Sequence, residues 1–406
     1  MLAIVAPGQG AQTPGFLDPW VSESSFSDRL NWLSAVSGVD LEHYGVHADA
    51  ETIRDTAVAQ PLLVATGLLA ALELFPHPAD AYPLIGVAAG HSVGEITAAA
   101  GVGVFSAESA MVFVAERGRA MAAASAARPT SMTAVVGGQA DEVAAALEAQ
   151  GLTAANNNGT GQVVAAGTVE QLAALAENPP TRARLIPLSV AGAFHTVHMK
   201  PAVDRLSRLS RAISTHDPRT RLLSNLDGQV VHDGRDVLRR LVGQVASPVR
   251  WDLCMAAMAD LGVTGLLELP PAGTLTGIAK RNLKGVELFA LNTPDQTEGA
   301  LDFIARHGGQ PASSTPITAN PTWRLVVSPG KGQFSRTEDI EAGMLLPVAS
   351  TIGLVKNSRD EVAISAPYGG IVVEWLVEDG DPVSPGQPLL RLHPTVESDE
   401  ATEVTR

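Results

Sequence analysis

The chain is poor in cysteine, since only Cys254 among its 406 residues carries a thiol. One cysteine excludes an intrachain disulfide and suits a reducing compartment, so we expect a cytoplasmic protein. Charged residues make up 17% and aromatic residues 4%, whereas 45% are hydrophobic, which predicts a sizeable globular core. Basic residues are also scarce, 28 against 43 acidic ones, and the net charge of −15 argues against nucleic acid as a partner.

Segments for targeting or membrane insertion are lacking as well. Residues 1–6 are apolar but short, with no basic start, and predict a first strand instead of a signal peptide. No uncharged apolar run looks long enough to cross a bilayer, so we expect no membrane partner. The Gly-rich residues 7–12 match neither the P-loop nor the dinucleotide-binding spacing, so we expect no nucleotide cofactor, and no metal site is expected.

The length predicts two or three domains. Residues 1–128 and 193–307 alternate strand-like and helical segments, a pattern typical of an α/β layered core with a parallel sheet. The expected helices of this core cover residues 58–75, 106–126 and 203–213, and its later strands cover residues 222–225 and 263–269.

Residues 129–192 form a more regular unit inserted in this core. The order β-α-β-β-α-β predicts a ferredoxin-like subdomain, with the run Asn156-Asn157-Asn158-Gly159 as a turn between its second and third strands. The expected strands are 133–136, 152–155, 162–165 and 184–190, and the expected helices are 141–150 and 168–177.

The amino-acid composition changes after the core. Residues 308–322 are rich in Gly, Pro, Ser and Thr and predict a linker. Residues 323–394 contain short Val- and Ile-rich runs separated by Gly and Pro, which predicts a small all-β domain. Its clearest strands are 362–365, 370–375 and 388–392, and residues 395–406 are expected to be a mobile acidic tail.

The most informative motif is Gly90-His91-Ser92-Val93-Gly94, a G-x-S-x-G run between a strand-like segment and an Ala-rich helical one. In a nucleophile elbow of this kind, a sharp turn presents the serine hydroxyl at the start of a helix. Free N–H groups at that helix end can stabilise an oxyanion, so the motif predicts acyl transfer through Ser92. Alone, the motif fits a tight turn in a Gly-rich chain equally well.

A serine nucleophile needs a base, and His195 follows directly on the last strand of the inserted unit. A lone histidine is more commonly a partly buried side chain bonded to the backbone. His198 is the second candidate, whereas the side chain of His91 should diverge from that of Ser92. No acidic residue stands out as a triad partner, so a Ser-His dyad oriented by a backbone carbonyl is the simplest prediction.

Two further residues could bind substrate. Arg117 lies on the helix after the elbow, where a buried guanidinium would clamp a carboxylate. Taken alone, a solvated arginine paired with Glu116 or Glu108 is the favoured alternative. Gln9 follows the first strand in a Gly-flanked turn, at the sheet edge where α/β proteins bind ligands.

Together these motifs resemble the malonyl-CoA:acyl carrier protein transacylases and the related acyltransferase domains of polyketide synthases. The matching runs, in the family's order within residues 1–305, are 7–12, 90–95, 117, 156–159, 193–195, 199–202 and 248–251. The resemblance implies an α/β-hydrolase-like core and a ping-pong transfer of malonyl from malonyl-CoA to acyl carrier protein. It places the enzyme in fatty acid or polyketide synthesis.

The resemblance also implies roles for the residues at the elbow. Ser92, activated by His195, attacks the malonyl thioester, and the backbone amides of Gln9 and Val93 hold the oxyanion. The carbonyl of Gln244 orients the histidine, which fits the missing acid.

Selectivity follows from two other matches. Arg117 clamps the malonyl carboxylate, and an acetyl group would leave it buried and unpaired. Phe194 matches the malonyl-selecting pattern, because an aromatic ring there crowds an α-methyl group. One departure from the family is Pro270-Pro271-Ala272-Gly273 in place of its usual Gly-Pro-Gly, which could alter a loop near the site.

The second domain resembles the biotinyl and lipoyl carrier domains, a barrel-sandwich hybrid fold. Residues 366–374 and 377–389 fit the second half of that fold. Arg359 stands where the family has its modified lysine, and Lys356 is out of register, so we expect neither biotin nor lipoate. A degenerate module that docks a protein partner is the preferred role, and an inert fusion is the alternative.

Docking of an acidic carrier protein requires a basic patch. Lys200, Arg205 and Arg208 are the preferred candidates, residues 280–284 are the second choice, and a solvated helix face is the alternative. Two other functions remain open: a serine acyl-thioester hydrolase that uses water as acceptor, and a non-catalytic carrier-protein scaffold.

Overall fold

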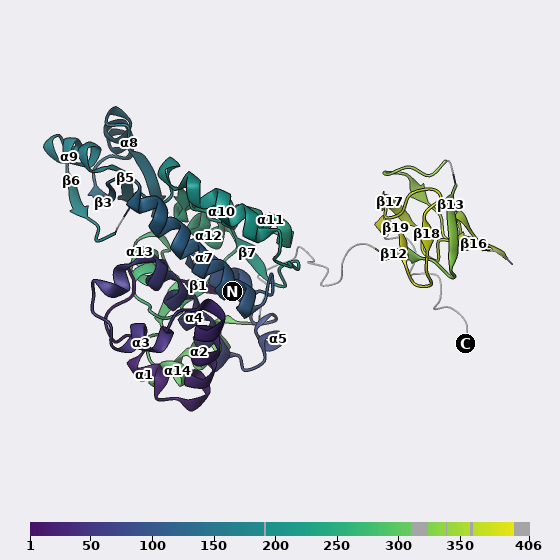
Figure 1. The fold of residues 1–406 in the computed structure, drawn as a ribbon, viewed down its shortest axis with the longest axis horizontal. Coiled ribbons are helices and arrows are strands. Elements are labelled where there is room, and N and C mark those ends of the chain that lie inside the picture. The colour runs from purple at the N-terminus through teal and green to yellow at the C-terminus, as the bar shows by residue number, and fades with distance from the viewer. Residues whose placement is uncertain (191, 310–323, 338, 358–359, 394–406) are drawn as a thin grey trace. The chain divides into compact units, whose positions relative to one another are not determined.

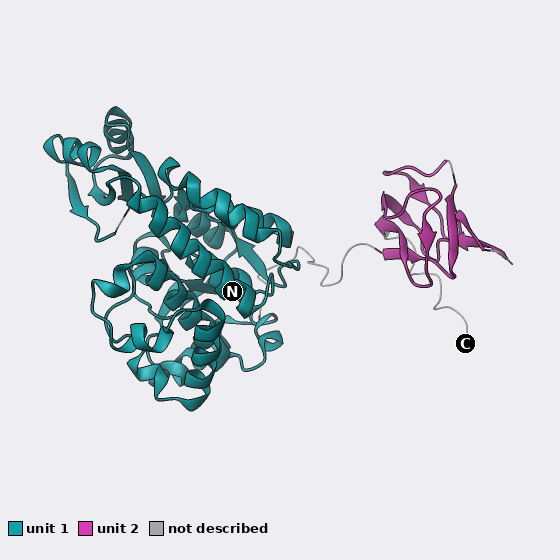
Figure 2. Cartoon of the chain, viewed as in Figure 1, with its two compact units in different colours: residues 1–313 teal, residues 314–406 magenta. Residues whose placement is uncertain are grey.

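The computed structural model describes the chain except residues 191, 310–323, 338, 358–359 and 394–406 (Figure 1). Contacts divide the chain into two units, Met1–Ser313 and Ser314–Arg406 (Figure 2). The expected acidic tail and most of the expected linker lie outside the described residues.

The centre of the first unit is a six-stranded sheet in the order β11-β10-β1-β2-β7-β8, parallel except for the last pair. Along β1, Leu2, Ile4 and Ala6 join one hydrophobic cluster, whereas the alternate side chains join another. Both faces of this strand are therefore buried, as in other parallel sheets. The strands are β1 (Leu2–Ala6), β2 (Ile85–Gly90), β7 (Arg221–Leu223), β8 (Val230–Val231), β10 (Gly265–Glu268) and β11 (Glu287–Ala290).

Helices cover this sheet, and several were not predicted. Residues 18–54, which the sequence analysis left unassigned, contain three α-helices and a 3₁₀ turn. The helices of this part are α1 (Asp18–Val21), α2 (Ser24–Ser37), α3 (Leu41–Val46), α4 (Thr56–Leu74), α5 (Pro78–Ala81), α6 (Gly94–Gly101), α7 (Ala107–Ala126), α10 (Lys200–Ser210), α11 (Gly234–Gln244), α12 (Trp251–Asp260), α13 (Thr274–Asn282) and α14 (Thr297–His307), with 3₁₀ turns at Thr52–Arg54, Val197–Met199 and Pro294–Gln296.

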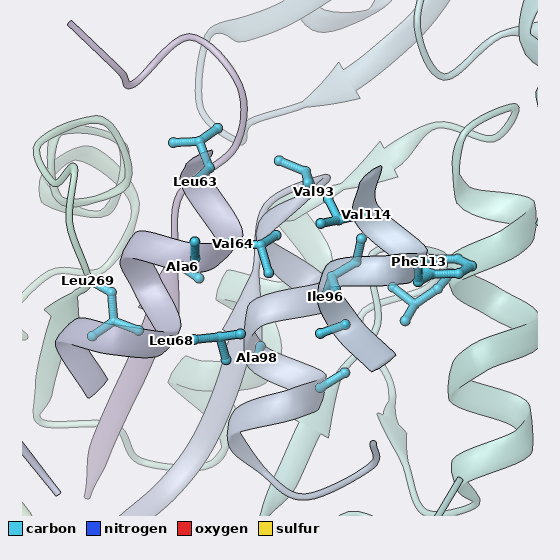
Figure 3. Close-up of a cluster of buried hydrophobic side chains, with 14 of the residues drawn as sticks. Ala6, Leu63, Val64, Leu68, Val93, Ile96, Ala98, Phe113, Val114 and Leu269 are labelled. Atoms are coloured by element: carbon cyan, nitrogen blue, oxygen red, sulfur yellow. The ribbon is translucent and has the colours of Figure 1, made fainter. Parts of the chain in front are cut away.

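Helix α4 bears on the expectation that no uncharged apolar run can cross a membrane. By length and composition its 19 residues could do so, with a mean hydropathy of 1.7, although they include the charged Glu73. However, 72% of its most apolar stretch is buried in the protein. Leu63, Val64 and Leu68 of α4 belong to one hydrophobic cluster with side chains of α6 and α7 (Figure 3). Helix α4 is therefore a core helix.

A second sheet of the first unit has the order β6-β3-β5-β4-β9 and gathers with α8 and α9 at one end of the unit (Figure 1). Strand β9 comes from outside residues 129–192 and pairs in parallel with β4 through Asn156 and Asn157. These two asparagines lie in a strand and not in the expected turn. The elements are β3 (Thr130–Gly137), α8 (Ala140–Ala149), β4 (Thr153–Asn157), β5 (Gln162–Thr168), α9 (Val169–Glu177), β6 (Ala183–Pro187) and β9 (Val249–Arg250).

The loop with the unusual residues 270–273 is held by a buried carboxylate. Glu268, at the end of β10, accepts hydrogen bonds from the backbone N–H groups of Gly273, Leu275 and Thr276 at 2.8–2.9 Å. Glu268 satisfies the first N–H groups of α13, and the Asn292 side chain holds the loop as well, because its Oδ1 accepts from the Ala272 N–H at 2.7 Å.

The second unit consists of two four-stranded antiparallel sheets, β12-β19-β17-β14 and β16-β15-β13-β18. Phe334, Ile352 and Leu389 are fully buried in its hydrophobic cluster. Lys356 lies at the end of β15, 3.7 Å from the Glu361 carboxylate, and Arg359 lies outside the described residues. The strands are β12 (Arg324–Val327), β13 (Gly332–Arg336), β14 (Leu345–Leu346), β15 (Thr351–Lys356), β16 (Glu361–Ser365), β17 (Gly370–Trp375), β18 (Pro382–Val383) and β19 (Pro388–His393).

Candidate active site

The G-x-S-x-G run forms a sharp turn between β2 and α6. Ser92 lies at the turn with a φ of 54°, in the left-handed region that few non-glycine residues adopt. The flanking glycines are required by close approach: a Cβ on Gly90 would overlap the backbone of Gly94, and one on Gly94 would overlap the Ala6 carbonyl. The turn therefore fixes the serine hydroxyl at the start of α6.

His195 contacts the serine hydroxyl. Its Nε2 lies 2.7 Å from Ser92 Oγ, and its Nδ1 lies 2.8 Å from the Gln244 carbonyl oxygen. Because a carbonyl oxygen can only accept, Nδ1 carries the proton and Nε2 is free to accept one from the serine. The residue that meets Ser92 is thus His195 and not His198, which lies on the following 3₁₀ turn.

The imidazole is neutral in this site. Burial and the nearby positive charge of Arg117 lower the pKa of His195 to about 3, although the Gln244 carbonyl opposes this shift. No carboxylate among the described residues bonds to the ring, in agreement with the missing triad acid. His195 is therefore available as a base at neutral pH.

Arg117 is completely buried, so the solvated alternative was wrong. Its guanidinium donates hydrogen bonds to Gln60 Oε1 at 2.6 Å, to Gln244 Oε1 at 2.9 Å and to Ser92 Oγ at 3.5 Å. Glu116, the expected surface partner, pairs instead with other arginines. Burial lowers the pKa of Arg117 to about 9, which leaves it charged at neutral pH.

A buried network that the sequence analysis missed supports these groups. Glu95 Oε2 accepts from Gln244 Nε2 at 2.5 Å, and the same carboxylate accepts from the Asn225 N–H at 3.3 Å. Asn225 Oδ1 in turn accepts from the Ser92 N–H at 2.8 Å. Glu95 and Asn225 therefore tie the nucleophile to the residue that orients the base. Burial raises the pKa of Glu95 to about 7.

The loop after β1 lies against the elbow. A Cβ on Gly8 would come within 2.8 Å of the His91 carbonyl oxygen, so only glycine fits this approach. Within the described part of the chain, the N–H groups of Gln9 and Val93 donate to no other protein group and are free to meet a substrate oxygen. The His91 ring diverges as expected, since its Nε2 lies 3.0 Å from Asn158 Oδ1.

The remaining predicted residues lie in two places. Phe194 is buried next to His195 in the chain. Lys200, Arg205 and Arg208 are exposed on α10, but Arg205 is bonded to Glu116 at 2.7 Å across the α7–α10 contact. The described residues contain no group of three or more His, Cys, Asp or Glu side chains placed to hold a metal ion.

Glu95 and His195 should make opposite contributions to the pH dependence of stability. Native Glu95 keeps its proton up to about pH 7, against an ordinary pKa of 4.5, so its contribution to the free energy of unfolding falls as pH rises through that window. Native His195 resists protonation down to about pH 3, against 6.5, so its contribution rises with pH from about 3 to 6.5. Between about pH 4.5 and 6.5, the two slopes of about 1.4 kcal/mol per pH unit cancel.

Single substitutions should expose these slopes. In Glu95→Gln only the His195 contribution remains, so the free energy of unfolding should rise with pH between pH 4.5 and 6.5, by up to about 1.4 kcal/mol per pH unit more than in the wild type. In His195→Asn only the Glu95 contribution remains, so the free energy of unfolding should fall with pH over the same range, by up to about the same amount. Urea unfolding, followed by far-UV circular dichroism as a probe of the helical first unit, measures both. Equal slopes in the two variants would contradict the assignment.

Comparisons with known proteins agree with this geometry. The family model "Acyl transferase domain" matches residues 4–305. Malonyl CoA-acyl carrier protein transacylase from Mycobacterium tuberculosis is 48% identical over 294 residues, which is 72% of this chain and 97% of that protein. The crystal structure of MCAT from the same organism matches with a TM-score of 0.71 and 47% identity, over 74% of this chain and 99% of that one.

A solved complex of a type II PKS acyl-carrier protein with its malonyl-transacylase is also similar. It matches with a TM-score of 0.67 and 29% identity, over 74% of this chain and 99% of the matched one. The family model covers well over half of the chain and ends before the second unit. The chain therefore belongs to the acyl transferase domain family.

Proposed function

We propose that this chain transfers a malonyl group from malonyl-CoA to the phosphopantetheine thiol of acyl carrier protein, through a malonyl ester on Ser92. The observation that carries this proposal is the buried guanidinium of Arg117, 3.5 Å from the Ser92 hydroxyl. A fixed cation in a dry site beside the nucleophile selects an acyl group that ends in a carboxylate. The names of the relatives, malonyl transacylases, support the same substrate.

The first half of the reaction loads the enzyme. His195 Nε2 takes the proton of Ser92 as the hydroxyl oxygen attacks the thioester carbonyl, and the N–H groups of Gln9 and Val93 stabilise the oxyanion. The Gln244 carbonyl holds the imidazolium through its Nδ1–H. The imidazolium then protonates the departing CoA sulfur, which leaves malonyl on the serine.

The second half reverses these roles. The carrier thiol gives its proton to His195 and attacks the malonyl ester. As the intermediate collapses, the bond from the acyl carbon to Ser92 Oγ breaks, the His195 imidazolium protonates that oxygen, and the malonyl group stays on the carrier sulfur. Throughout, the malonyl carboxylate accepts hydrogen bonds from Arg117. Phe194 crowds an α-methyl group, which disfavours methylmalonyl.

The finer fold assignments belong to the same proposal. Residues 1–128 and 193–307 form the α/β-hydrolase-like catalytic core, and residues 129–192 a ferredoxin-like insert, an assignment supported by the strand order β6-β3-β5-β4. Residues 323–394 form a biotinyl/lipoyl-like domain that carries no cofactor and binds a protein partner. We assign the protein to the cytoplasm.

Intact-mass spectrometry tests the proposed transfer. After incubation with malonyl-, methylmalonyl- or acetyl-CoA, we expect a malonyl adduct that disappears when acyl carrier protein is added. Steady release of CoA without carrier protein would indicate the hydrolase instead, and neither adduct nor release would indicate the scaffold. The untreated mass should equal that of the unmodified chain, and an added biotin or lipoate would overturn the cofactor prediction.

The docking surface is tested by charge reversal on α10. Arg205 and Arg208, with Lys200 nearby, offer positive charge to an acidic carrier, and one of them is partly neutralised by Glu116. The double variant Arg205→Glu/Arg208→Glu should raise the KM for carrier protein about tenfold and leave the KM for malonyl-CoA unchanged. The control Arg29→Glu/Arg306→Glu removes two exposed ion pairs elsewhere and should change neither constant. An unchanged carrier KM in the first variant would reject this surface.

A further inference from the structure

Glu95 and Arg117 are buried groups of opposite charge on either side of one amide group. The Gln244 side chain lies between them: its Nε2 donates to Glu95 Oε2 at 2.5 Å, and its Oε1 accepts from the Arg117 guanidinium at 2.9 Å. The charge of Glu95 opposes the fall in the pKa of Arg117 that burial causes. Before a substrate binds, ionised Glu95 is therefore the counter-ion of Arg117.

A second cation near Glu95 is already neutralised. Arg240 of α11 contributes positive charge to the surroundings of Glu95. However, its guanidinium pairs with the carboxylates of Asp227 at 2.8 Å and Asp236 at 3.1 Å. Arg117 is therefore the cation that an incoming carboxylate must use.

The other titratable groups buried near Glu95 are uncharged at neutral pH. Burial raises the pKa of the Cys254 thiol on α12 and lowers the pKa of the His91 and His195 rings. Strands β1 and β2, which pack against α6, contain no titratable side chain. On α4, α7 and α11, the remaining charged side chains are at least partly exposed to solvent: Glu73, Glu108, Glu116, Arg119, Arg235 and Arg239.

We propose that Glu95 takes up a proton from solvent when a malonyl group enters the site, so that the malonyl carboxylate replaces it as the counter-ion of Arg117. The inference rests on the proposed function, because an acyl group without a carboxylate brings no second anion. Two ionised carboxylates beside one cation in a dry site are costly, so one of them is protonated. The malonyl carboxylate keeps its charge because it meets the guanidinium directly, whereas Glu95 accepts from neutral donors.

The surroundings of Glu95 suit both of its forms. The ionised carboxylate accepts from the Gln244 side chain, the Asn225 N–H and the Ser224 hydroxyl. A hydroxyl can also accept, so Ser224 can receive the hydrogen bond of the protonated form. Burial raises the pKa of Glu95 to about 7, so the free protein holds both forms at neutral pH.

Glu95 is thereby a specificity-determining residue, although it does not touch the acyl group. It loses its proton as pH rises through about 7 in the free protein, and malonyl binding must return that proton. Malonyl affinity therefore falls as pH rises, whereas acetyl affinity does not. Arg117 keeps its charge up to about pH 9, so this dependence belongs to Glu95 between pH 6 and 8.

Calorimetric titration of the full-length Ser92→Ala protein counts the proton, since this variant binds acyl-CoA without turnover. Titrations in two buffers of different ionisation enthalpy give the protons taken up per ligand, and subtraction of the acetyl-CoA value cancels the ionisations of CoA itself. We expect malonyl-CoA to take up about half a proton more than acetyl-CoA at pH 7, and about 0.9 more at pH 8. The dissociation constant of malonyl-CoA, relative to that of acetyl-CoA, should rise about tenfold from pH 6 to pH 8.

Two further substitutions in the Ser92→Ala protein assign the proton. Glu95→Gln keeps the shape of the side chain but cannot titrate, so the extra proton uptake and the tenfold change should both disappear. A merely structural role would instead weaken binding equally at every pH. Glu298→Gln is the matched control: Glu298 is also the second residue of its helix, α14, but it is exposed, and both quantities should stay unchanged.

The outcomes separate this inference from the proposed function. A preference for malonyl-CoA without extra proton uptake overturns the inference alone, whereas no preference for malonyl-CoA at pH 6 overturns both. Extra uptake that persists in Glu95→Gln places the proton on another group and rejects the role of Glu95. If Glu95→Gln does not fold, infrared difference spectra of the Ser92→Ala protein decide. Malonyl-CoA with a ¹³C-labelled carboxyl group should then produce the band of an unlabelled protonated carboxyl, and the lack of this band would reject the proposal.

Discussion

Replacing Ser92 with alanine should lower the rate of malonyl transfer by about 10⁴-fold or more, and replacing His195 with alanine should cost nearly as much. The hydroxyl is a weak nucleophile unless Nε2 removes its proton, and the two atoms lie 2.7 Å apart. Because Ser92 needs His195 as its base and His195 has no other nucleophile to activate, the Ser92→Ala/His195→Ala double variant should be no slower than Ser92→Ala. The measurement is the rate of malonyl-CoA consumption in the presence of carrier protein.

A matched control distinguishes this pair from general damage. His198 lies three residues from His195, outside the contacts of the nucleophile, and His198→Ala should leave the rate within about twofold of the wild type. Two results would contradict the assignment of the base: a His195→Ala enzyme that keeps most of its activity, or a double variant whose loss equals the product of the single losses.

The elbow was predictable because consecutive residues determine it. Gly90, Ser92 and Gly94 impose the turn locally, and the flanking apolar and Ala-rich segments indicate the strand and the helix. His195 could be proposed because it follows the last strand of the insert. The role of Gln244 was predicted only from the family resemblance. Every residue has a backbone carbonyl, so residue type cannot indicate which carbonyl accepts from the histidine.

The rest of the network could not be predicted from local patterns. Gln60, Glu95 and Asn225 come from α4, α6 and the segment after β7, and only the fold brings them together. Asn225 lies 133 residues from Ser92 along the chain. The position of Glu95 directly after the elbow indicated that it could lie near the site. Nothing in the sequence indicated that the Gln244 side chain would donate a hydrogen bond to it.

Two errors in the fold have simple physical causes. Helix α2 was overlooked, although its buried residues Phe26, Leu30 and Leu33 have the helical i, i+4, i+7 spacing. The expected turn at residues 156–159 was wrong in part, because Asn156 and Asn157 pair with β9, which lies about 90 residues further along the chain. In the first case the helical spacing of the apolar residues was missed, and in the second the strand is defined by pairing with a distant segment.

Replacing Arg117 with alanine should lower the rate of malonyl loading by about 10²- to 10⁴-fold and leave acetyl loading unchanged or faster. The malonyl carboxylate must leave water to enter this buried site, and without the guanidinium it would be an unpaired charge, a loss of about 3–5 kcal/mol. An acetyl group carries no charge that must leave water, so removal of the cation should not lower the rate of acetyl loading. Arg117→Lys should restore little of the malonyl loading rate, because an ammonium group cannot form the two parallel hydrogen bonds that a planar guanidinium makes with two carboxylate oxygens.

The neighbouring Arg119 provides the control on the same helix. It is half exposed and pairs with Glu116 at 3.5 Å, a contact of little energetic weight, so Arg119→Ala should leave both loading rates within about twofold. Intact-mass measurement of the acyl-enzyme over time, with malonyl-CoA and acetyl-CoA in parallel, gives the ratio of the two rates for each variant. If malonyl and acetyl loading fell equally in Arg117→Ala, the arginine would serve to hold Gln60 and Gln244 in place and not to select the substrate. A fall in malonyl loading alone assigns the selectivity to the charge.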